Sequence, residues 1–278
     1  MKAPIKSGLF FICICYLFIA ETTFAGNIAL RMQATLTIAA GRIEVRITTA
    51  NLGTEPARDL QAFLHIFNRN LASDTTPRLD VGQTRSFFFR LPVSAKNKGR
   101  FAFIAEALYH DANQKPFSAL ACDVFRLKHK AAPDLTGAAT DMTFKGKGRL
   151  PVQISNPLPH ALNCTATLHL PRGLTAPIKE QKVMLASNSQ KTIEFQLFDP
   201  YEIGDAAYPV FCIIEYEKNG THGAVIVSST VYVKGFKNWF KQTRWWWLAG
   251  LVPIVLMWIA VLFPRKKLKG NNITEKQI

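Results

Sequence analysis

The chain has 278 residues, 48% of them hydrophobic, and its 34 lysines and arginines against 19 aspartates and glutamates give a net charge of +15. This length leaves room for two ordinary domains besides membrane elements. The basic residues are scattered along the chain and concentrate only near a C-terminal apolar run. This distribution favours contact with a membrane surface over binding of nucleic acid.

Residues 1–25 have the pattern of a secretory signal peptide. Lys2 and Lys6 precede an apolar region at residues 9–20, and residues 23–25 form a small-residue site suited to cleavage before Gly26. An uncleaved first membrane helix is the alternative, although the apolar region is short for a span. The sequence therefore predicts export of the region that follows.

Residues 245–263, WWWLAGLVPIVLMWIAVLF, form an uncharged run typical of a transmembrane helix. As a helix the run is roughly 28 Å long, close to the ~30 Å of a bilayer's hydrocarbon core. A juxtamembrane segment at residues 237–244 precedes it, and a basic tail at residues 264–278 follows. The predicted membrane-interface residues are Trp239, Trp245, Trp246 and Trp247 outside and Arg265, Lys266 and Lys267 inside. This pattern predicts a single-pass protein of the bacterial plasma (inner) membrane, with an extracytoplasmic ectodomain and a cytoplasmic tail.

The region between these segments is an internal repeat of short alternating segments. Residues 41–48, GRIEVRIT, recur as residues 148–155, GRLPVQIS, and each segment ends in a turn that contains an asparagine. Residues 79–91 match residues 185–197 without a gap. Apolar and polar residues alternate with the period of two that is typical of β-strands. The register holds over several strands, which indicates a duplicated module.

We predict an all-β fold of two tandem immunoglobulin-like sandwiches followed by the transmembrane helix. Each copy has about 100 residues and roughly seven strands, as such sandwiches have. The first domain spans residues 26–130 and the second residues 143–236. Residues 131–142, rich in small and polar side chains, form the predicted linker.

The turns resemble those of a known group of bacterial domains. Residues 51–57 (NLGTEPA), 154–157 (ISNP) and 170–174 (LPRGL) resemble turns of bacterial Ig-like domains of the alpha-galactosidase-associated and cell-adhesion-related type. The layout resembles membrane-anchored Gram-positive surface proteins with two such domains before a C-terminal helix. The resemblance implies a non-catalytic adhesion, scaffold or binding role, and it transfers no functional residue.

Three cysteines remain after the predicted cleavage. Alternation places Cys164 and Cys212 on the core face of the second module, which leaves open a Cys164–Cys212 disulfide or two buried thiols. Cys122 has no evident partner and is predicted to be a core thiol of the first module.

The sequence shows no catalytic constellation and no compact metal site. No histidine is spaced for metal binding with another histidine or a cysteine. His65 and His169 are equivalent by the repeat, which favours a shared structural position over a ligand pair. No nucleophile elbow, phosphate-binding loop or close carboxylate pair is present. We therefore expect neither enzymatic activity nor a cofactor.

One predicted strand, at residues 101–109, is apolar on both faces, and its repeat partner is similar. The outward apolar side chains form a candidate partner surface: Phe63, Phe67, Ile104, Leu108, Phe211 and Ile213. A contiguous apolar patch marks a contact site for a protein partner or for the second module. Coverage by the chain's own loops and linker is the alternative.

These features predict a membrane-anchored extracytoplasmic scaffold or adaptor that binds a protein partner in an envelope complex. The alternative is a glycan- or cell-wall-binding module tethered to the membrane. Sugar platforms favour tryptophan, and the only one before the anchor is Trp239. A third class, an envelope hydrolase, has no catalytic constellation in its favour.

Overall fold

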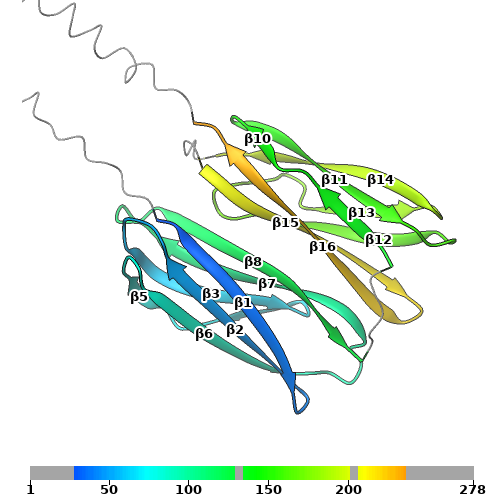
Figure 1. Ribbon diagram of the computed structural model, residues 1–278, viewed down its shortest axis with the longest axis horizontal. Helices are drawn as coiled ribbons and strands as arrows, with labels where there is room; N and C mark the ends of the chain where they lie inside the picture. Colours follow the sequence, from blue (N-terminus) through cyan, green and yellow to red (C-terminus); the bar gives the residue numbers. More distant parts are fainter. Residues whose placement is uncertain (1–27, 129–133, 201–205, 236–278) are drawn as a thin grey trace, which may run out of the picture. The chain divides into compact units, whose positions relative to one another are not determined.

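The computed structural model describes residues 28–128, 134–200 and 206–235, and within them the chain is all-β (Figure 1). The predicted signal peptide, juxtamembrane segment, transmembrane helix, membrane-interface residues and tail lie outside the described residues. Among the described residues, no helix is long and apolar enough to cross a membrane. The described strands form two sandwiches, which we call module 1 (residues 28–128) and module 2 (residues 134–235).

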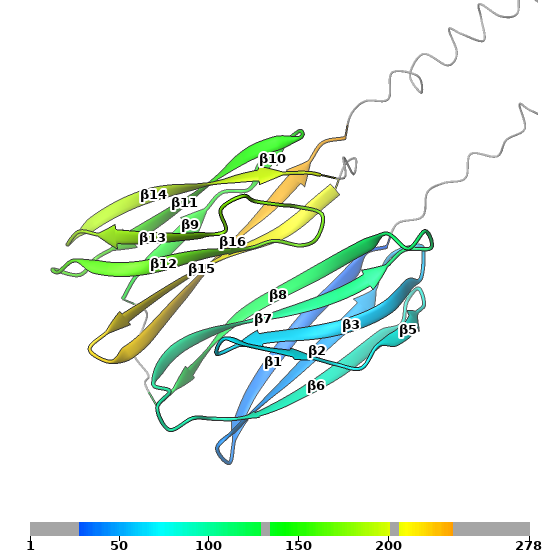
Figure 2. The ribbon, with the colours of Figure 1, turned by 180° about the vertical axis from the view of Figure 1, so that it is seen from behind.

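Module 1 is a sandwich of eight strands in two layers (Figure 2). The strands are β1 (Leu30–Ala39), β2 (Arg42–Asn51), β3 (Ala57–Ile66), β4 (Arg69–Ala72), β5 (Thr76–Leu79), β6 (Thr84–Pro92), β7 (Gly99–His110) and β8 (Pro116–Leu127). One layer has the order β1-β2-β6, and the other contains β8, β7, β3 and β4, with β5 also paired to β3. The core between the layers contains Ile43, Val45, Leu64, Phe87, Phe89 and Phe103.

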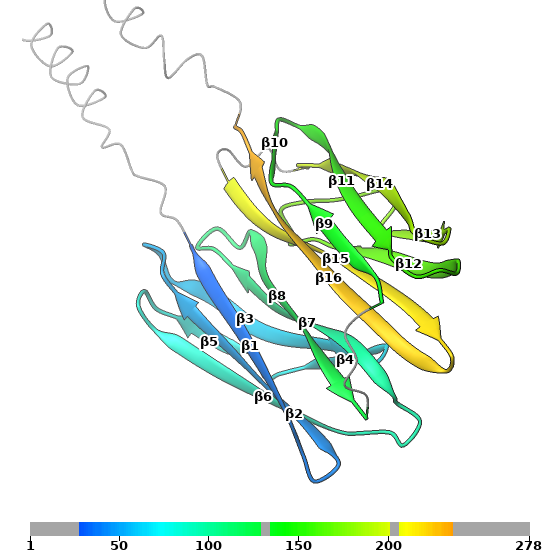
Figure 3. The same cartoon turned by 45° about the vertical axis from the view of Figure 1, so that its right-hand side comes forward.

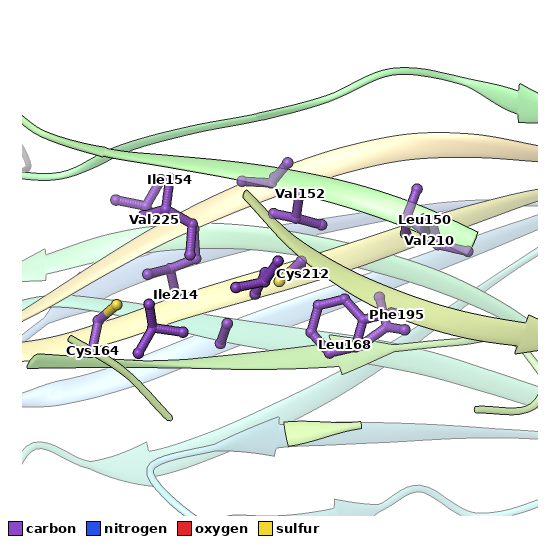
Figure 4. Close-up of a cluster of buried hydrophobic side chains, with 14 of the residues drawn as sticks. Leu150, Val152, Ile154, Cys164, Leu168, Phe195, Val210, Cys212, Ile214 and Val225 are labelled. Atoms are coloured by element: carbon purple, nitrogen blue, oxygen red, sulfur yellow. The ribbon is translucent and has the colours of Figure 1, made fainter. Parts of the chain in front are cut away.

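Module 2 repeats this arrangement, also with eight strands (Figure 3). They are β9 (Thr136–Ala139), β10 (Met142–Phe144), β11 (Lys147–Asn156), β12 (Leu162–His169), β13 (Glu180–Leu185), β14 (Ser189–Phe198), β15 (Ala206–Lys218) and β16 (Thr221–Val233). One layer has the order β14-β11-β9, and the other has the order β13-β12-β15-β16, with β10 parallel to β16. Its core contains Leu150, Ile154, Leu168 and Phe195 (Figure 4), together with Leu197.

The alternation of the sequence explains why these segments are strands. In β2 the side chains of Ile43, Val45 and Ile47 are fully buried, while those of Arg42 and Glu44 are exposed. A strand directs successive side chains to opposite faces, so this pattern buries one face of the sheet and leaves the other in water. The same rule positions the outward faces that form the sites described below.

Module 2 begins earlier than the sequence predicts. Strand β9 lies within the predicted linker at residues 131–142, and it pairs with β11 through Ala139 opposite Val152. Leu135 is fully buried in the module 2 core. Strands of three or four residues contain too few alternating positions to show a periodicity, and for this reason each module has eight strands rather than about seven.

A buried asparagine closes the same turn in both modules. The Asn51 amide donates hydrogen bonds to the carbonyls of Glu55 (2.8 Å) and Leu79 (3.1 Å). Its side-chain oxygen accepts one from the Gly53 amide at 3.0 Å. Because Asn51 is fully buried, these three bonds replace the water that its amide loses.

Asn156 makes the matching bonds in module 2. Its amide donates to the carbonyls of His160 (2.9 Å) and Ala186 (2.8 Å), and its oxygen accepts from the Leu158 amide at 3.1 Å. The duplication that the sequence predicts therefore extends to individual hydrogen bonds.

Replacing this asparagine should destabilise the fold strongly. Asn156→Ala removes the three hydrogen bonds that the buried Asn156 side chain makes to the turn, and only the Ala186 carbonyl keeps a second partner, the Ser189 hydroxyl. We expect a loss of about 2–4 kcal/mol in the free energy of unfolding. Denaturant titration of the purified chain measures this loss. Asn163→Ala, at an exposed position of β12, is the matched control and should change stability by less than about 0.5 kcal/mol. Equal effects of the two substitutions would contradict the structural role of Asn156.

Candidate functional site

The outward apolar faces of the two modules pack against each other. Ile104 of β7 and Ile213 of β15 are 6% and 5% exposed and belong to one apolar cluster. We call it the junction cluster; it contains buried Ile104, Leu120 and Ile213, with Ala102, Cys122, Phe211 and Ile226 packed around them. Both modules belong to one compact unit of the chain, which ends at Lys234.

The junction cluster contains three of the six residues of the partner surface that the sequence predicts. Ile104, Phe211 and Ile213 lie in it, so this part of the surface contacts the other module, which is one of the two roles predicted for it. Phe67 lies at the β3–β4 turn, where its ring packs edge-on against Phe101 at 5.0 Å. Phe63 and Leu108 are half-buried on the outward faces of β3 and β7. The six residues therefore do not form one continuous exposed patch.

Backbone contacts of Gly99 and His222 also join the modules. The His222 amide donates a hydrogen bond to the Lys98 carbonyl at 3.0 Å, and Gly99 pairs with His222 in a parallel contact between β7 and β16. Gly99 has a φ of 128°, and a Cβ atom at this position would overlap the His222 carbonyl. Only glycine allows the two strands to approach this closely.

The His222 side chain combines an aromatic contact with two carboxylates. Its ring stacks on Phe101 of module 1, with centroids 4.6 Å apart and planes 9° from parallel. Nδ1 lies 2.8 Å from the Glu217 carboxylate, and Nε2 lies 3.3 Å from that of Glu215. Burial alone would lower the pKa of His222, but the two carboxylates outweigh burial and raise it.

A cleft of about 1740 Å³ lies between the outward faces of the modules, beside the junction cluster. His65 of β3 lines it, with Nδ1 2.7 Å from the Asn70 side-chain oxygen and Nε2 3.6 Å from the Glu106 carboxylate. The nearby Glu106 carboxylate raises the pKa of His65 against the effect of burial. Burial opposes ionisation of Glu106, but its bonds with His65 and Ser118 hold its pKa below the usual range.

The opposite wall of the cleft contains His169 and Arg172 of module 2. The Arg172 amide donates a hydrogen bond to the Ser118 hydroxyl of module 1 at 2.9 Å. Burial, reinforced by the charge of His65, lowers the pKa of His169 to about 4. The two histidines that the repeat makes equivalent thus line one cleft, but their pKa values are shifted in opposite directions.

The structure holds Cys164 and Cys212 as free thiols rather than as the disulfide considered from the sequence. Both point into the core of module 2, as the alternation predicts (Figure 4). However, the pairing of β12 with β15 places Leu168, not Cys164, opposite Cys212. The offset of four residues separates the two cysteines by roughly 13 Å along the strands, against the ~6 Å that a disulfide requires.

All three described thiols are poor nucleophiles, because burial raises their pKa values. The pKa of Cys212 rises to about 12, and that of Cys164 rises as well. Cys122 is packed against the junction cluster rather than in the module 1 core where the sequence placed it, and its pKa rises to about 12. A thiol reacts as the thiolate, so these cysteines act as apolar side chains.

The junction and the cleft bring together residues of both modules. They combine an apolar cluster, a cleft, and histidines that lie beside carboxylates. Within the described ranges, no group of three or more histidine, cysteine, aspartate or glutamate side chains is placed to hold a metal ion. Sequence analysis missed Glu106, Arg172 and His222, because nothing in a strand pattern shows which outward side chains of two modules meet.

A scan against protein families and a search of curated proteins found no match. Among solved structures, the chain is similar to the trypsin-activated alpha-2-macroglobulin of Escherichia coli, with 11% identity and a TM-score of 0.32. It is also similar to the transglutaminase of red sea bream, with 15% identity and a TM-score of 0.26. The alignments cover 76% and 74% of this chain but only 18% and 32% of the two larger proteins.

A third similar structure is a protein of unknown function from Porphyromonas gingivalis. It is 14% identical, with a TM-score of 0.29, and the alignment covers 73% of this chain and 98% of that protein. At such low identities and TM-scores, none of the three similarities carries an inference about function.

Adding a methyl group at Gly99 should open the junction. In Gly99→Ala the new Cβ overlaps the His222 carbonyl, so we expect the His222 amide to exchange with solvent deuterium at least ~10-fold faster. Gly41→Ala is the control, because Gly41 also has a positive φ but no atom near the position of a Cβ. Unchanged protection of the His222 amide in Gly99→Ala would show that this contact does not hold the modules together.

Acid should destabilise the protein through His169. A histidine whose folded pKa is lowered contributes stability above its unfolded pKa of about 6.5, and this stability is lost as the pH falls toward the folded value. His65 and His222 have raised pKa values, so the stability that they contribute is fully present below about pH 6.5. Below that pH it no longer increases, and it therefore does not offset the stability lost through His169.

The variant His169→Gln tests this assignment. Between pH 7.5 and pH 5, its free energy of unfolding should fall by about 2 kcal/mol less than that of the wild type. Denaturant titrations at the two pH values measure the difference, and His160→Gln, at an exposed position of module 2, should behave as the wild type. Parallel pH dependence of His169→Gln and the wild type would contradict the buried, neutral state of His169.

Proposed function

We propose that the chain is a membrane-anchored extracytoplasmic scaffold or adaptor of the bacterial envelope, with two modules of the bacterial Ig-like type, and that it binds a protein partner without catalytic turnover. The observation that carries this proposal is the junction. Buried Ile104 and Ile213, the stacked Phe101–His222 pair and the Arg172–Ser118 bond all join the modules.

A scaffold benefits from such a junction because rigid binding surfaces lose little conformational freedom when a partner docks. Most two-domain chains have relative domain motion unless the interface is large and apolar. Here the modules share an apolar cluster and two hydrogen bonds, from the Arg172 amide to Ser118 and from the His222 amide to Lys98. The transmembrane anchor and orientation that the sequence predicts would hold this body next to the membrane.

A glycan- or cell-wall-binding role is the second candidate. It is favoured by the cleft, whose wall on β12 presents Asn163, Thr165 and Thr167. Hydroxyl and amide groups bind sugar hydroxyls, and a cleft of this size accommodates a short oligosaccharide. Retrieval of bound polysaccharide without protein would favour this role over the scaffold.

The first test is affinity purification of the tagged full-length chain from mildly solubilised native membranes. We expect the wild type and Gly41→Ala to retrieve the same reproducible set of proteins, and Gly99→Ala, with its opened junction, to lose those members of the set that need both modules held in place. If Gly99→Ala retrieves the same proteins in the same amounts, a rigid junction is not what the partner needs. Substrate turnover by the purified chain would overturn the non-catalytic proposal.

A further inference from the structure

The outer face of the sheet β1-β2-β6 has an unusual composition. This face, which we call the arginine face, presents exposed Arg31, Arg42, Arg46 and Arg90 together with Glu44 and Phe88. The three strands are in register, so that Thr35, Arg46 and Phe88 form one cross-strand row, and Thr37, Glu44 and Arg90 form the next. Arg46, Arg90 and Glu44 thus lie in the Phe88 row or the next one, and Arg31 and Arg42 lie two rows away on either side of it.

Phe88 is 65% exposed, although burying a phenylalanine contributes about 1.5–3 kcal/mol. The Arg46 guanidinium lies 5.1 Å from the centre of its ring, a cation–π arrangement that keeps Arg46 extended over the ring. Arg90 Nε is 3.0 Å from the Glu44 carboxylate, and both side chains remain largely exposed. The row therefore holds a guanidinium and an aromatic ring together at the surface.

Module 2 shows that the sandwich itself does not require these residues. The position equivalent to Phe88 is Glu194, which lies 3.6 Å from Arg149 in an exposed pair. The position equivalent to Arg46 is Gln153. Arg149 is equivalent to Arg42, but the outer face of module 2 has neither an aromatic ring at position 194 nor an arginine at position 153. Since the same fold forms without them, the Arg46–Phe88 pair of module 1 needs an explanation other than folding.

We infer that the arginine face is the docking surface for the partner of the scaffold, and that the partner is a protein with an acidic patch around an apolar side chain. Aromatic residues and arginine are enriched at protein interfaces and among the residues that carry their binding energy. Arginine binds carboxylates with paired hydrogen bonds, and an excess of positive charge steers an acidic partner toward the face. This inference rests on the proposed scaffold function and assigns its surface.

The composition favours a protein over a polyanion or a small molecule. Glu44 lies in the middle of the face and would repel a uniformly anionic polymer, whereas a protein surface offers both charges and an apolar group. A small ligand needs a concave pocket that covers most of its surface, and the arginine face is the outside of a three-stranded sheet.

Site-specific photo-crosslinking tests the inference. The full-length chain carries benzoylphenylalanine in place of Phe88, and native membranes are irradiated. We expect one protein adduct whose crosslinked peptide is net negative, with a yield that falls at least ~10-fold when Arg46→Glu and Arg90→Glu are added. Benzoylphenylalanine in place of Glu194 is the matched control and should give no such adduct. An unchanged melting temperature of the double variant excludes unfolding as the cause.

Several outcomes overturn the inference. They are the absence of an adduct, an adduct with lipid, polysaccharide or a second copy of this chain, a crosslinked peptide that is not acidic, and equal yields at positions 88 and 194. The affinity purification described above separates the two proposals. If proteins are retrieved there but position 88 gives no adduct, the scaffold function stands and the arginine face is not its docking surface. If no protein is retrieved and no adduct forms, both proposals are wrong.

Discussion

The structure of this chain depends on the mutual burial of two apolar outer faces. Strands β7 and β15 carry apolar side chains on both faces, and one face of each fills its own core. The other face would contact water if each module stood alone. Burial of Ile104, Leu120 and Ile213 contributes about 1.5–3 kcal/mol for each side chain, more than the ~1 kcal/mol of the Arg172–Ser118 hydrogen bond. Apolar burial therefore holds the modules together, and the polar contacts determine how they fit.

The duplication separates what the fold requires from what the junction requires. Asn51 and Asn156 close equivalent turns with the same three kinds of hydrogen bond, and neither module can lose them without burying unpaired groups. The outward positions are not under this constraint. Glu106 of β7 corresponds to Ile213 of β15, so one copy presents a carboxylate where the other presents an apolar side chain. The two copies have similar cores, one in each module, and different surfaces.

Much of the fold was predictable from the sequence, because the face of a strand depends only on its period of two. This rule correctly placed Cys164 and Cys212 in the core of module 2, and the burial of Ile43 and Val45 in β2 follows it. It does not give the register between strands, and a shift of four residues decides that these two cysteines do not meet. The rule also fails for β9 and β10, which are too short to show a period.

The junction illustrates a further limit of sequence analysis. The sequence shows that residues 101–109 are apolar on both faces, but it does not show what covers the outer face. The answer depends on residues more than a hundred positions away, such as Phe211 and Ile213. Hydrogen bonds between modules, such as that from Arg172 to Ser118, have no sequence pattern at all.

Charge is balanced at the junction and unbalanced on the arginine face. The cleft is lined by four lysines and arginines and by four glutamates, and His65 and His222 lie beside carboxylates. His169 has no carboxylate within hydrogen-bonding distance among the described residues, so burial dominates and its pKa falls. Because these groups neutralise one another, the cleft attracts neither acidic nor basic partners strongly. The excess of positive charge on the arginine face has no such compensation, and long-range attraction of an acidic partner would therefore act there.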